Sequence, residues 1–410
     1  MQTVAQSWLV YRLTGSALLL GSVGFASQFP VFLAAPVGGT VADRSNRHRI
    51  VVMTQAASMV LALILAALTL SHLVKVWHIF VLAALLGLVN AFDIPGRQAF
   101  LVDMVGKEDL MNAIALNSSM FNGARIIGPA VAGILVARIG EGWCFFANGV
   151  SYIAVIVGLL LMKIHCPPRS KTDSPLEDIK EGFRFVTRTK PIRALLLLLG
   201  LVSLVGMPYA VLMPVFADRI LHGGARGLGI LMGCTGIGAL MGAFTLALRE
   251  GVKGLGRLVA WMCGAFGVSL VLFSFSRNFW LSALLLLPVG FSMMLQMASS
   301  NTLIQSMVPD ALRGRVMALY SMMFMGMAPF GALLGGAVAD KLGAPIAVAI
   351  GGLASVAGAF VFGKALPSFR TEARALIPAQ GVAGGEPAGG MTARLEAIES
   401  IEELEQEEHL

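Results

Sequence analysis

Apolar stretches of about 20 residues recur along most of the chain, and short polar segments separate them. An α-helix rises ~1.5 Å per residue, so about 20 apolar residues cross the ~30 Å hydrocarbon layer of a bilayer. Backbone groups in lipid must bond within the chain itself, which favours helices. The pattern predicts an all-α integral membrane protein. Its eleven predicted spans are 17–41, 50–71, 76–98, 111–137, 143–163, 193–216, 227–248, 255–275, 279–304, 313–339 and 345–366.

The opening stretch, Met1–Leu13, has the composition of a further span but is short. As a helix it reaches only ~20 Å, which does not cross a bilayer. We therefore expect a twelve-helix plan in which the first helix is truncated in this sequence.

Charge predicts the orientation of these helices. Only 13% of residues are charged, against about 25% in soluble proteins, and the net charge is +7. Basic residues concentrate on alternate loops, which the positive-inside rule assigns to the cytoplasm together with both termini. The rich loops hold Arg44, Arg47, Arg49, Arg169, Lys171, Lys180, Arg184, Arg188, Lys190, Arg193, Arg249, Lys253, Arg257, Arg313 and Arg315.

A basic central loop, 164–192, divides the spans into an N-terminal bundle at 1–163 and a C-terminal bundle at 193–366. Within the loop, Ser174 and Pro175 favour the start of a surface helix that runs to Phe185. The remainder, 367–410, is predicted to be a flexible, acidic cytoplasmic tail. Its last residues are either disordered or a helix that binds a partner weakly.

The two bundles contain an internal repeat. Residues 104–140 align without a gap onto residues 307–343, and eleven of the 37 aligned pairs are identical. When the truncated helix is counted as the first span, 111–137 is the fifth and 313–339 the eleventh. The fifth span therefore repeats as the eleventh, in the same orientation. Two six-helix bundles in parallel repeat are the plan of transporters that move two halves about a central site.

The loop after the second span contains Gly39, followed at fixed spacing by an acid and a basic cluster. It resembles the G-x-x-x-D-R-x-G-R-R/K loop of the major facilitator superfamily. Asn46 replaces a glycine, and we expect it to keep the turn because asparagine tolerates a left-handed conformation. The resemblance implies a latch that holds the cytoplasmic ends together in the outward-open state. The latch residues are Gly39, Asp43, Arg44, Arg47 and Arg49, with Asp103 as the acid that receives Arg47.

An acid and a base lie at depth in the fourth span. Asp93 and Arg97 are four residues apart, so they can pair on one helix face, although Pro95 and Gly96 could kink that turn. Charges inside a membrane are costly and usually serve a cavity or a partner. Asp93 is either a proton-coupling or gating acid, or one member of a static ion pair.

The fifth span contains Gly123, Gly128, Pro129 and Gly133. This pattern resembles the G-P-x-x-G-G element of the exporter branch of the superfamily, which implies export by antiport. Arg125 falls near mid-bilayer, where it would bind an anionic substrate or neutralise an acid. Further candidates for the cavity wall, equally explained by hydrogen bonds between helices, are Asn122, Gln6 and Asn148.

Three stretches, 1–16, 93–100 and 308–316, resemble the enterobactin-exporter-like branch of bacterial exporters. The resemblance implies a proton-coupled, alternating-access exporter of a siderophore- or drug-like molecule in the bacterial inner membrane. Its partners would be the substrate, protons and lipid, with no cofactor and no nucleic acid.

Other classes of protein have weaker support. The chain has no GxxxxGK[ST] loop for ATP, no HExxH motif, no HxxxxD motif, and no paired cysteines for a metal site. An enzyme is therefore not expected. A lipid or lysophospholipid flippase and a transport-inactive scaffold or sensor stay open as alternatives.

Overall fold

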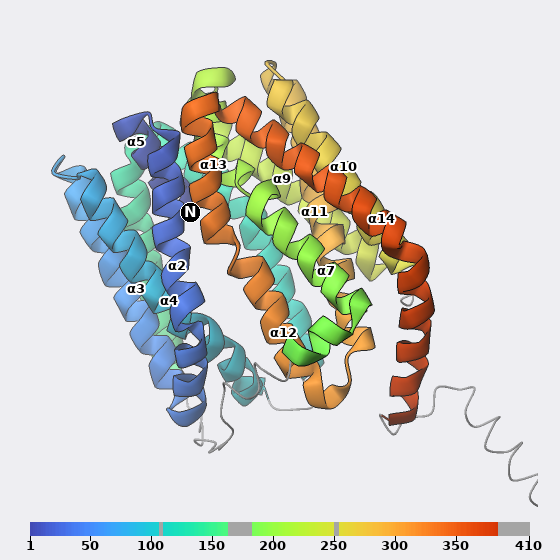
Figure 1. Cartoon of the computed structure of the whole chain (residues 1–410). Coiled ribbons are helices and arrows are strands. Elements are labelled where there is room, and N and C mark those ends of the chain that lie inside the picture. Colours follow the sequence, from blue (N-terminus) through green and yellow to red (C-terminus); the bar gives the residue numbers. More distant parts are fainter. Residues whose placement is uncertain (106–109, 163–182, 250–253, 384–410) are drawn as a thin grey trace, which may run out of the picture.

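The computed structural model describes residues 1–105, 110–162, 183–249 and 254–383, and every regular element within these ranges is a helix (Figure 1). Ten helical stretches in this part of the chain are long and apolar enough to cross a membrane. One of them, Ile127–Leu161, comprises two helices, because Gly140 between them has a non-helical φ of 83° and ψ of 169°. The ten stretches therefore correspond to the eleven predicted spans, and the all-α membrane fold is confirmed.

The helices form two halves. The N-terminal half contains α1 (Gln2–Thr14), α2 (Ala17–Arg44), α3 (Arg47–Leu70), α4 (Val76–Val105) and α5 (Leu110–Leu161). The C-terminal half contains α7 (Lys190–Leu201), η1 (Val202–Gly206), α8 (Tyr209–Val215), η2 (Phe216–Ile220), α9 (Gly224–Ala247), α10 (Leu255–Phe275), α11 (Phe279–Met307), α12 (Asp310–Met325), α13 (Ala328–Leu342) and α14 (Ala344–Ala383). We call the end of the bundle with the Gly343 turn the Gly343 end, at the top of Figure 1, and the opposite end the Asn46 end.

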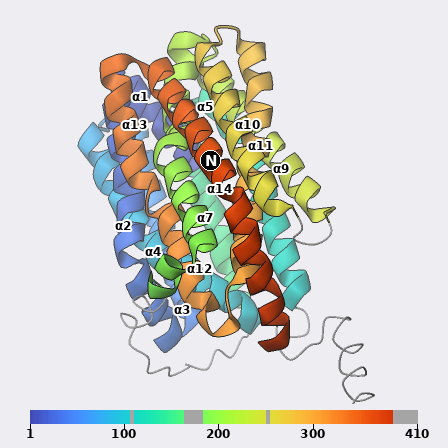
Figure 2. The same cartoon turned by 45° about the vertical axis from the view of Figure 1, so that its right-hand side comes forward.

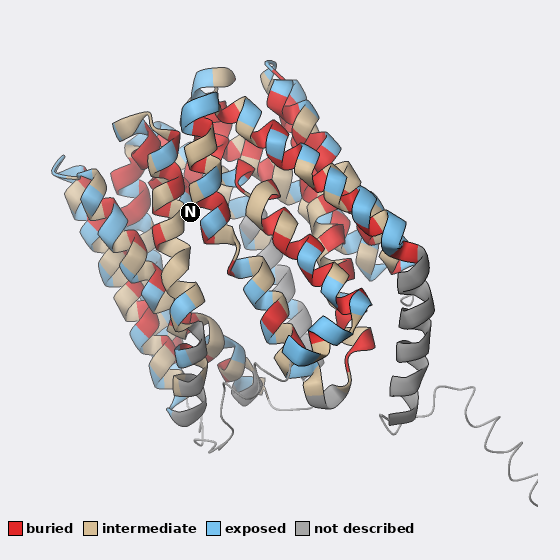
Figure 3. Ribbon diagram, viewed as in Figure 1, coloured by how far each residue is buried: buried red, intermediate tan, exposed pale blue. Residues whose placement is uncertain are grey.

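Large apolar side chains cover the outside of both halves. Trp77 is 60% exposed and Phe244 is 66% exposed, and the exposed positions alternate with buried ones along each helix (Figure 3). In water, such a surface would associate or aggregate. Lipid solvates this apolar surface, so the folded chain requires a bilayer around it.

Two seams between backbones join the halves near the Gly343 end. In the first, Gly133 of α5 faces Gly229 of α9, and a methyl group added at Gly229 would lie 2.8 Å from the Gly133 Cα. In the second, α2 packs on α13, and a methyl group at Gly21 would lie 2.3 Å from the Ala332 carbonyl oxygen. Small residues allow this approach because they leave no side chain between the helices.

The two seams are related by the internal repeat. Pro129 and Gly133 align with Ala332 and Gly336 in the repeat. In the first seam, the Pro129 carbonyl and Gly133 face Gly229 of the other half. In the second seam, the Ala332 carbonyl and Gly336 face Gly21 of the other half. Of the glycines that recur in the repeat, Gly133 and Gly336 are therefore contacts between the halves. Gly343, the partner of Gly140, also has a positive φ, of 91°, at the turn between two spans.

A side-chain bond strengthens the second seam. Ser16 caps α2 by accepting a hydrogen bond from the Leu19 amide at 3.3 Å, and its hydroxyl donates to Asp340 Oδ1 of α13 at 3.1 Å. Toward the Asn46 end the ribbons of the halves diverge, with α2 and α4 on one side and α12 on the other (Figure 1), while α13 stays beside α2 in the turned view (Figure 2). The halves are joined most closely at the Gly343 end.

The eleventh span is broken, although its apolar pattern predicts one continuous helix. It ends as α12 at Met325 and resumes as α13 at Ala328. Pro329 lacks an amide hydrogen and favours a helix start. The Phe32 ring of α2 lies against Gly326, where an added methyl group would be 2.6 Å from its Cδ2. The helix is therefore interrupted at the point where the Phe32 ring packs against Gly326.

The last span is longer than predicted. Helix α14 continues to Ala383, so it includes the first part of the segment that the sequence predicts to be a flexible tail. The acidic residues after it, 384–410, lie outside the described residues, as does most of the predicted surface helix at 176–185; residues 183–188 are helical.

A substitution in α9 tests the first seam. Gly229→Ala places a methyl group against the Gly133 backbone, and overpacking of this kind costs about 1–3 kcal/mol, so we expect a lower melting temperature. Gly233→Ala, one turn away, meets only the Ala130 Cβ at 3.9 Å and should leave stability equal or slightly raised. Thermal unfolding in detergent measures both. Equal shifts for the two variants would contradict a tight seam at Gly229.

Candidate functional site

A buried acid lies at the centre of the N-terminal half. Asp93 of α4 is 6% exposed, and its two oxygens have different partners. Oδ1 lies 2.7 Å from the hydroxyl of Thr54 and 2.8 Å from the amide nitrogen of Gln55, both on α3. Oδ2 lies 2.5 Å from the guanidinium of Arg97. A carboxylate in such a place needs these donors, because burial without them would be costly.

Helix geometry brings the pair together. Asp93 and Arg97 are one helical turn apart, and α4 stays helical through Pro95, so the predicted pairing on one face is observed. The two members differ in environment: the side chain of Asp93 is 8% exposed and that of Arg97 is 58% exposed. One end of the pair is therefore sealed within the helix packing, and the other is open.

A chain of polar groups continues from this pair across the half. Ser58 is buried one turn beyond Thr54 on α3, and Tyr152 of α5 lies near Ser58 and Asn148. The amide of Asn148 donates to Gln2 Oε1 of α1 at 2.9 Å. Asn148 thus joins α5 to α1 by a hydrogen bond, on the same half as the Asp93 site.

The loop of the predicted latch has a clear backbone. Helix α2 ends at Arg44, and α3 begins at Arg47 with Asn46 as its cap, since Asn46 Oδ1 accepts a hydrogen bond from the Arg49 amide at 3.1 Å. The expectation of a left-handed Asn46 is wrong, because its φ is −66° and its ψ is 108°. The turn is kept by the capping side chain of Asn46, which is the physical reason for asparagine there.

The predicted latch residues are placed only in part. Arg49 is exposed and Arg47 is half-buried, whereas the side chains of Asp43, Arg44 and Asp103 lie outside the described residues. His48, which replaces a basic residue of the family pattern, has its Nε2 2.7 Å from the Leu159 carbonyl oxygen. That contact ties the start of α3 to the end of α5.

Two neighbouring glycines of α2 differ in their packing. At Gly38, an added methyl group would lie 2.1 Å from the Ala91 carbonyl oxygen of α4. At Gly39, the glycine of the loop motif, such a group would have no heavy atom within 4 Å. In this conformation Gly38 allows close helix packing, and Gly39 faces open space.

The residues of the exporter-type element of α5 are also placed only in part. Gly133 and the Pro129 carbonyl form the seam with α9, whereas an added methyl group at Gly123 would meet no heavy atom within 4 Å, and one at Gly128 would meet only the Met1 nitrogen, at 3.7 Å. The helix is described at Asn122 and Arg125, but their side chains are not.

The remaining predicted residue, Gln6, is 7% exposed in α1, one turn after Gln2. Near the Gly343 end, Glu141 is buried and pairs with Arg12 of α1 at 2.8 Å. Within the described ranges, no group of three or more His, Cys, Asp or Glu side chains is placed to hold a metal ion.

The sequence patterns did not single out four residues near this site: Thr54, Gln55, Ser58 and Tyr152. The first three were detectable, because Ser58 lies four positions after Thr54 and three after Gln55 in an otherwise apolar helix, and these spacings place residues on one face. Tyr152 carried no such signal, since a single tyrosine in a span is equally typical of the lipid interface.

The family of transmembrane secretion effectors, MFS_3, matches residues 1–385. The chain belongs to this family. It is therefore a transporter of the major facilitator superfamily and not an enzyme, which confirms the resemblance that the loop and span motifs indicated. The family is one of multi-pass membrane proteins, in agreement with the helices described above.

Curated relatives of this family member include exporters. It is 27% identical to the staphyloferrin A transporter of Staphylococcus aureus, over 88% of this chain and 90% of that one. It is 28% identical to the multidrug efflux pump Tap of Mycolicibacterium fortuitum, over 83% and 85%. It is 26% identical to the enterobactin exporter EntS of Escherichia coli O1:K1, over 75% and 73%.

Solved structures agree on the fold. The nucleoside transporter NupG superposes with a TM-score of 0.70 at 14% identity, covering 89% of this chain and 94% of that one. At such low identity the likeness concerns the fold alone, and it confirms the two-bundle architecture.

Replacing Thr54 by valine tests the buried site. The variant keeps the side-chain shape and removes a donor to Asp93, so we expect the free energy of unfolding to fall by about 1–3 kcal/mol. Thr69→Val is the matched control, because Thr69 is buried on the same helix and its hydroxyl donates to the Leu65 carbonyl. Chemical denaturation in detergent measures both variants. A smaller loss for Thr54→Val than for Thr69→Val would argue against its bond to Asp93.

Proposed function

We propose that this transporter exports a small siderophore- or drug-like molecule from the cytoplasm, driven by proton entry in an alternating-access cycle. The proposal of a substrate class rests on the relatives, whose names give a siderophore transporter, a multidrug pump and an enterobactin exporter. The proposal of proton coupling rests on one observation in this chain, the buried and fully partnered carboxylate of Asp93.

Asp93 has the features that a coupling group needs. As a carboxylate it attracts Arg97 and accepts from two donors on α3. Protonation removes its charge, weakens the attraction to Arg97 and turns one oxygen into a donor. Thr54 and Gln55 then have to rearrange, which changes how α3 and α4 pack. A proton can thus shift the balance between two conformations by the difference in its affinity for them.

The exposed guanidinium of Arg97 allows an acidic substrate to compete with Asp93 for binding to it. When Asp93 is protonated, Arg97 loses its nearest anion and can bind an acidic group of the substrate instead. Proton and substrate would then alternate at one site, as antiport requires. Arg125, Asn122, Gln6 and Asn148 are proposed as further cavity residues, with Arg125 as a second cation for an acidic substrate.

The arrangement of the halves supports an assignment of conformation. We infer that the Asn46 end is cytoplasmic, because the basic loops lie there, and that both termini share this side of the bacterial inner membrane. The seams then close the outer end, so the conformation is inward-open. The proposed organisation is an N-terminal bundle at 1–163, a loop at 164–192, a C-terminal bundle at 193–366 and a tail at 367–410.

The proposed latch works in the opposite conformation. When the Asn46 end closes, the helix ends that carry Asp43, Arg44, Arg47, Arg49 and Asp103 approach the other half and form ion pairs there. The open space beside Gly39 fits this scheme, because a glycine needed only in the other state has no close contact in this one.

Export by inverted membrane vesicles under an imposed pH gradient tests the coupling. The substrate panel holds a catecholate siderophore, a carboxylate siderophore and hydrophobic antibiotics. We expect Asp93→Asn to reduce gradient-driven uptake to the level of vesicles without the protein, since the amide does not titrate. Glu141→Gln is the matched control: it alters an equally buried acid outside the Asp93 site and should retain gradient-driven uptake.

Asp93→Asn vesicles with full gradient-driven uptake would remove Asp93 from the mechanism. If uptake by wild type and by both variants does not depend on the pH gradient, the proposal of proton coupling is wrong, and the proposal of export stands. Movement of a labelled phospholipid between leaflets, without uptake of any panel compound, would favour the flippase alternative. A folded protein that moves neither would favour the scaffold or sensor alternative.

A second variant tests the latch. Gly39→Leu should leave the melting temperature unchanged, because its side chain enters open space, and should slow export at least about tenfold, or ~1.4 kcal/mol in the barrier, by blocking closure of the Asn46 end. Gly38→Ala is the contrast, since it should lower the melting temperature directly through its contact with Ala91. Normal export by Gly39→Leu would rule out a close contact at Gly39 in any transport state.

A further inference from the structure

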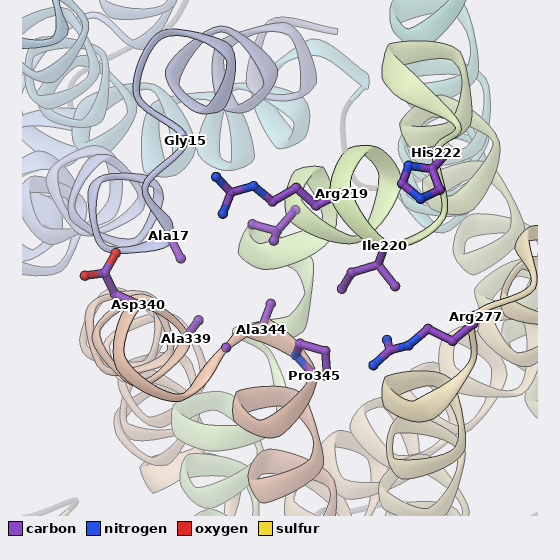
Figure 4. A pocket seen from close by; sticks show the side chains of 12 residues that line it. Gly15, Ala17, Arg219, Ile220, His222, Arg277, Ala339, Asp340, Ala344 and Pro345 are labelled. Carbon is purple, nitrogen blue, oxygen red and sulfur yellow. The ribbon is translucent and has the colours of Figure 1, made fainter.

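A cavity of about 480 Å³ opens at the Gly343 end, where four turns of the chain meet (Figure 4). Its size is in the range of small-molecule sites. Its walls come from the turn between α1 and α2, from η2 with the residues after it, from the turn between α10 and α11, and from the turn between α13 and α14. It lies far from Asp93, which is nearer to the Asn46 end, and the proposed export does not involve it.

The cavity is rich in positive charge. Arg219 of η2 and Arg277 before α11 both line it, with the imidazole of His222 as a third nitrogen-bearing group. In Figure 4, Arg219 extends toward Gly15 and Ala17, and Arg277 extends toward Pro345. Asp340 is the one acid among the lining residues, and its Oδ1 already accepts the bond from Ser16.

The two arginines, Arg219 and Arg277, have no salt-bridge partner in the described part of the chain. A guanidinium has five N–H donors in a planar fork, which match the two oxygens of a carboxylate or phosphate group. Two such groups line this cavity and form no salt bridge in the described part of the chain, so their chemistry suits an oxyanion.

The backbone has an unusual conformation at two residues that line the cavity, Arg219 and His222. Arg219 lies in a π-helical turn, a feature that re-aims side chains and is frequent at functional sites. His222 has a φ of 52°, a left-handed conformation that residues with a side chain seldom adopt. Both residues with this backbone geometry line the cavity.

The cavity also spans both halves of the molecule. Gly15 and Ala17 belong to the N-terminal half, and the other lining residues belong to the C-terminal half. The Arg219 guanidinium lies 3.4 Å from the point where a Gly15 Cβ would be. An anion held by Arg219 therefore sits at the seam between α2 and α13 and binds best when that seam is closed.

We propose that this cavity binds a small oxyanionic ligand with carboxylate or phosphate groups, and that the ligand stabilises the conformation with the α2–α13 seam closed. The oxyanion belongs either to a free solute or to the headgroup of an anionic lipid. Both sources present the same chemistry to Arg219 and Arg277. The proposal needs no transport step, so its test is independent of the export assay.

The test uses the full chain in nanodiscs of phosphatidylcholine, with citrate and pyrophosphate as probes and sodium chloride added to hold ionic strength constant. Wild-type protein should show a saturable rise in melting temperature with either probe. Arg219→Gln and Arg277→Gln should each raise the half-saturating concentration at least about tenfold, the equivalent of losing ~1.4 kcal/mol. Arg226→Gln is the matched control, an exposed arginine of the nearby α9 that does not line the cavity.

A second arm separates the two sources. Nanodiscs with phosphatidylglycerol should raise the melting temperature of wild-type protein, and should weaken the response to citrate by competition, if headgroups fill the cavity. An unchanged citrate response in these nanodiscs would assign the site to free solutes. Equal responses of wild type, Arg219→Gln and Arg277→Gln in both arms, or no saturable response of wild type, would overturn the proposal. Arg277 lies in an exposed turn, so Arg277→Gln provides a folded variant if Arg219→Gln is unstable.

Discussion

Contact of backbone with backbone across two glycine seams is the interaction on which the arrangement of the halves depends. Lipid supplies no hydrophobic force between helices, so their association rests on close packing and on hydrogen bonds. At Gly133 with Gly229, and at Gly21 with Gly336, no side chain separates the helices. Such contacts are short-ranged and involve no buried charge. They can separate without stranding an ion in lipid, which suits an interface that a transporter must open and close.

The polar chemistry is distributed unequally between the halves. In the described part of the chain, the intramembrane ion pair of Asp93 and Arg97 and its hydrogen-bonded neighbours belong to the N-terminal half. The C-terminal half buries uncharged groups, and Gln296 and Ser299 have no hydrogen-bond partner there. Repeat symmetry thus governs the packing of the seams but does not extend to the charged site. The described ion pair within the membrane therefore belongs to one half, and the glycine seams belong to both.

The two ends of the bundle differ in the same way. The Asn46 end carries the basic loops and the proposed latch, and its ribbons stand apart (Figure 1). The Gly343 end is closed by the seams and by the bond from Ser16 to Asp340, and it holds two arginines without salt-bridge partners in the described structure. Charge at one end is suited to forming a contact between halves, and charge at the other is suited to an external anion.

The sequence by itself determined the membrane class, the spans, the repeat, the family and the pairing of Asp93 with Arg97, because hydropathy, helical spacing and short motifs are local properties. Its local signals did not determine the break at Gly326, the cap at Asn46 or the length of α14. Only the tertiary structure decided which glycines are seams, that Thr54 and Gln55 hold Asp93, and that Arg219 and Arg277 share a cavity. Those contacts join residues far apart in the chain, and their partners follow from how the helices pack rather than from any pattern within one helix.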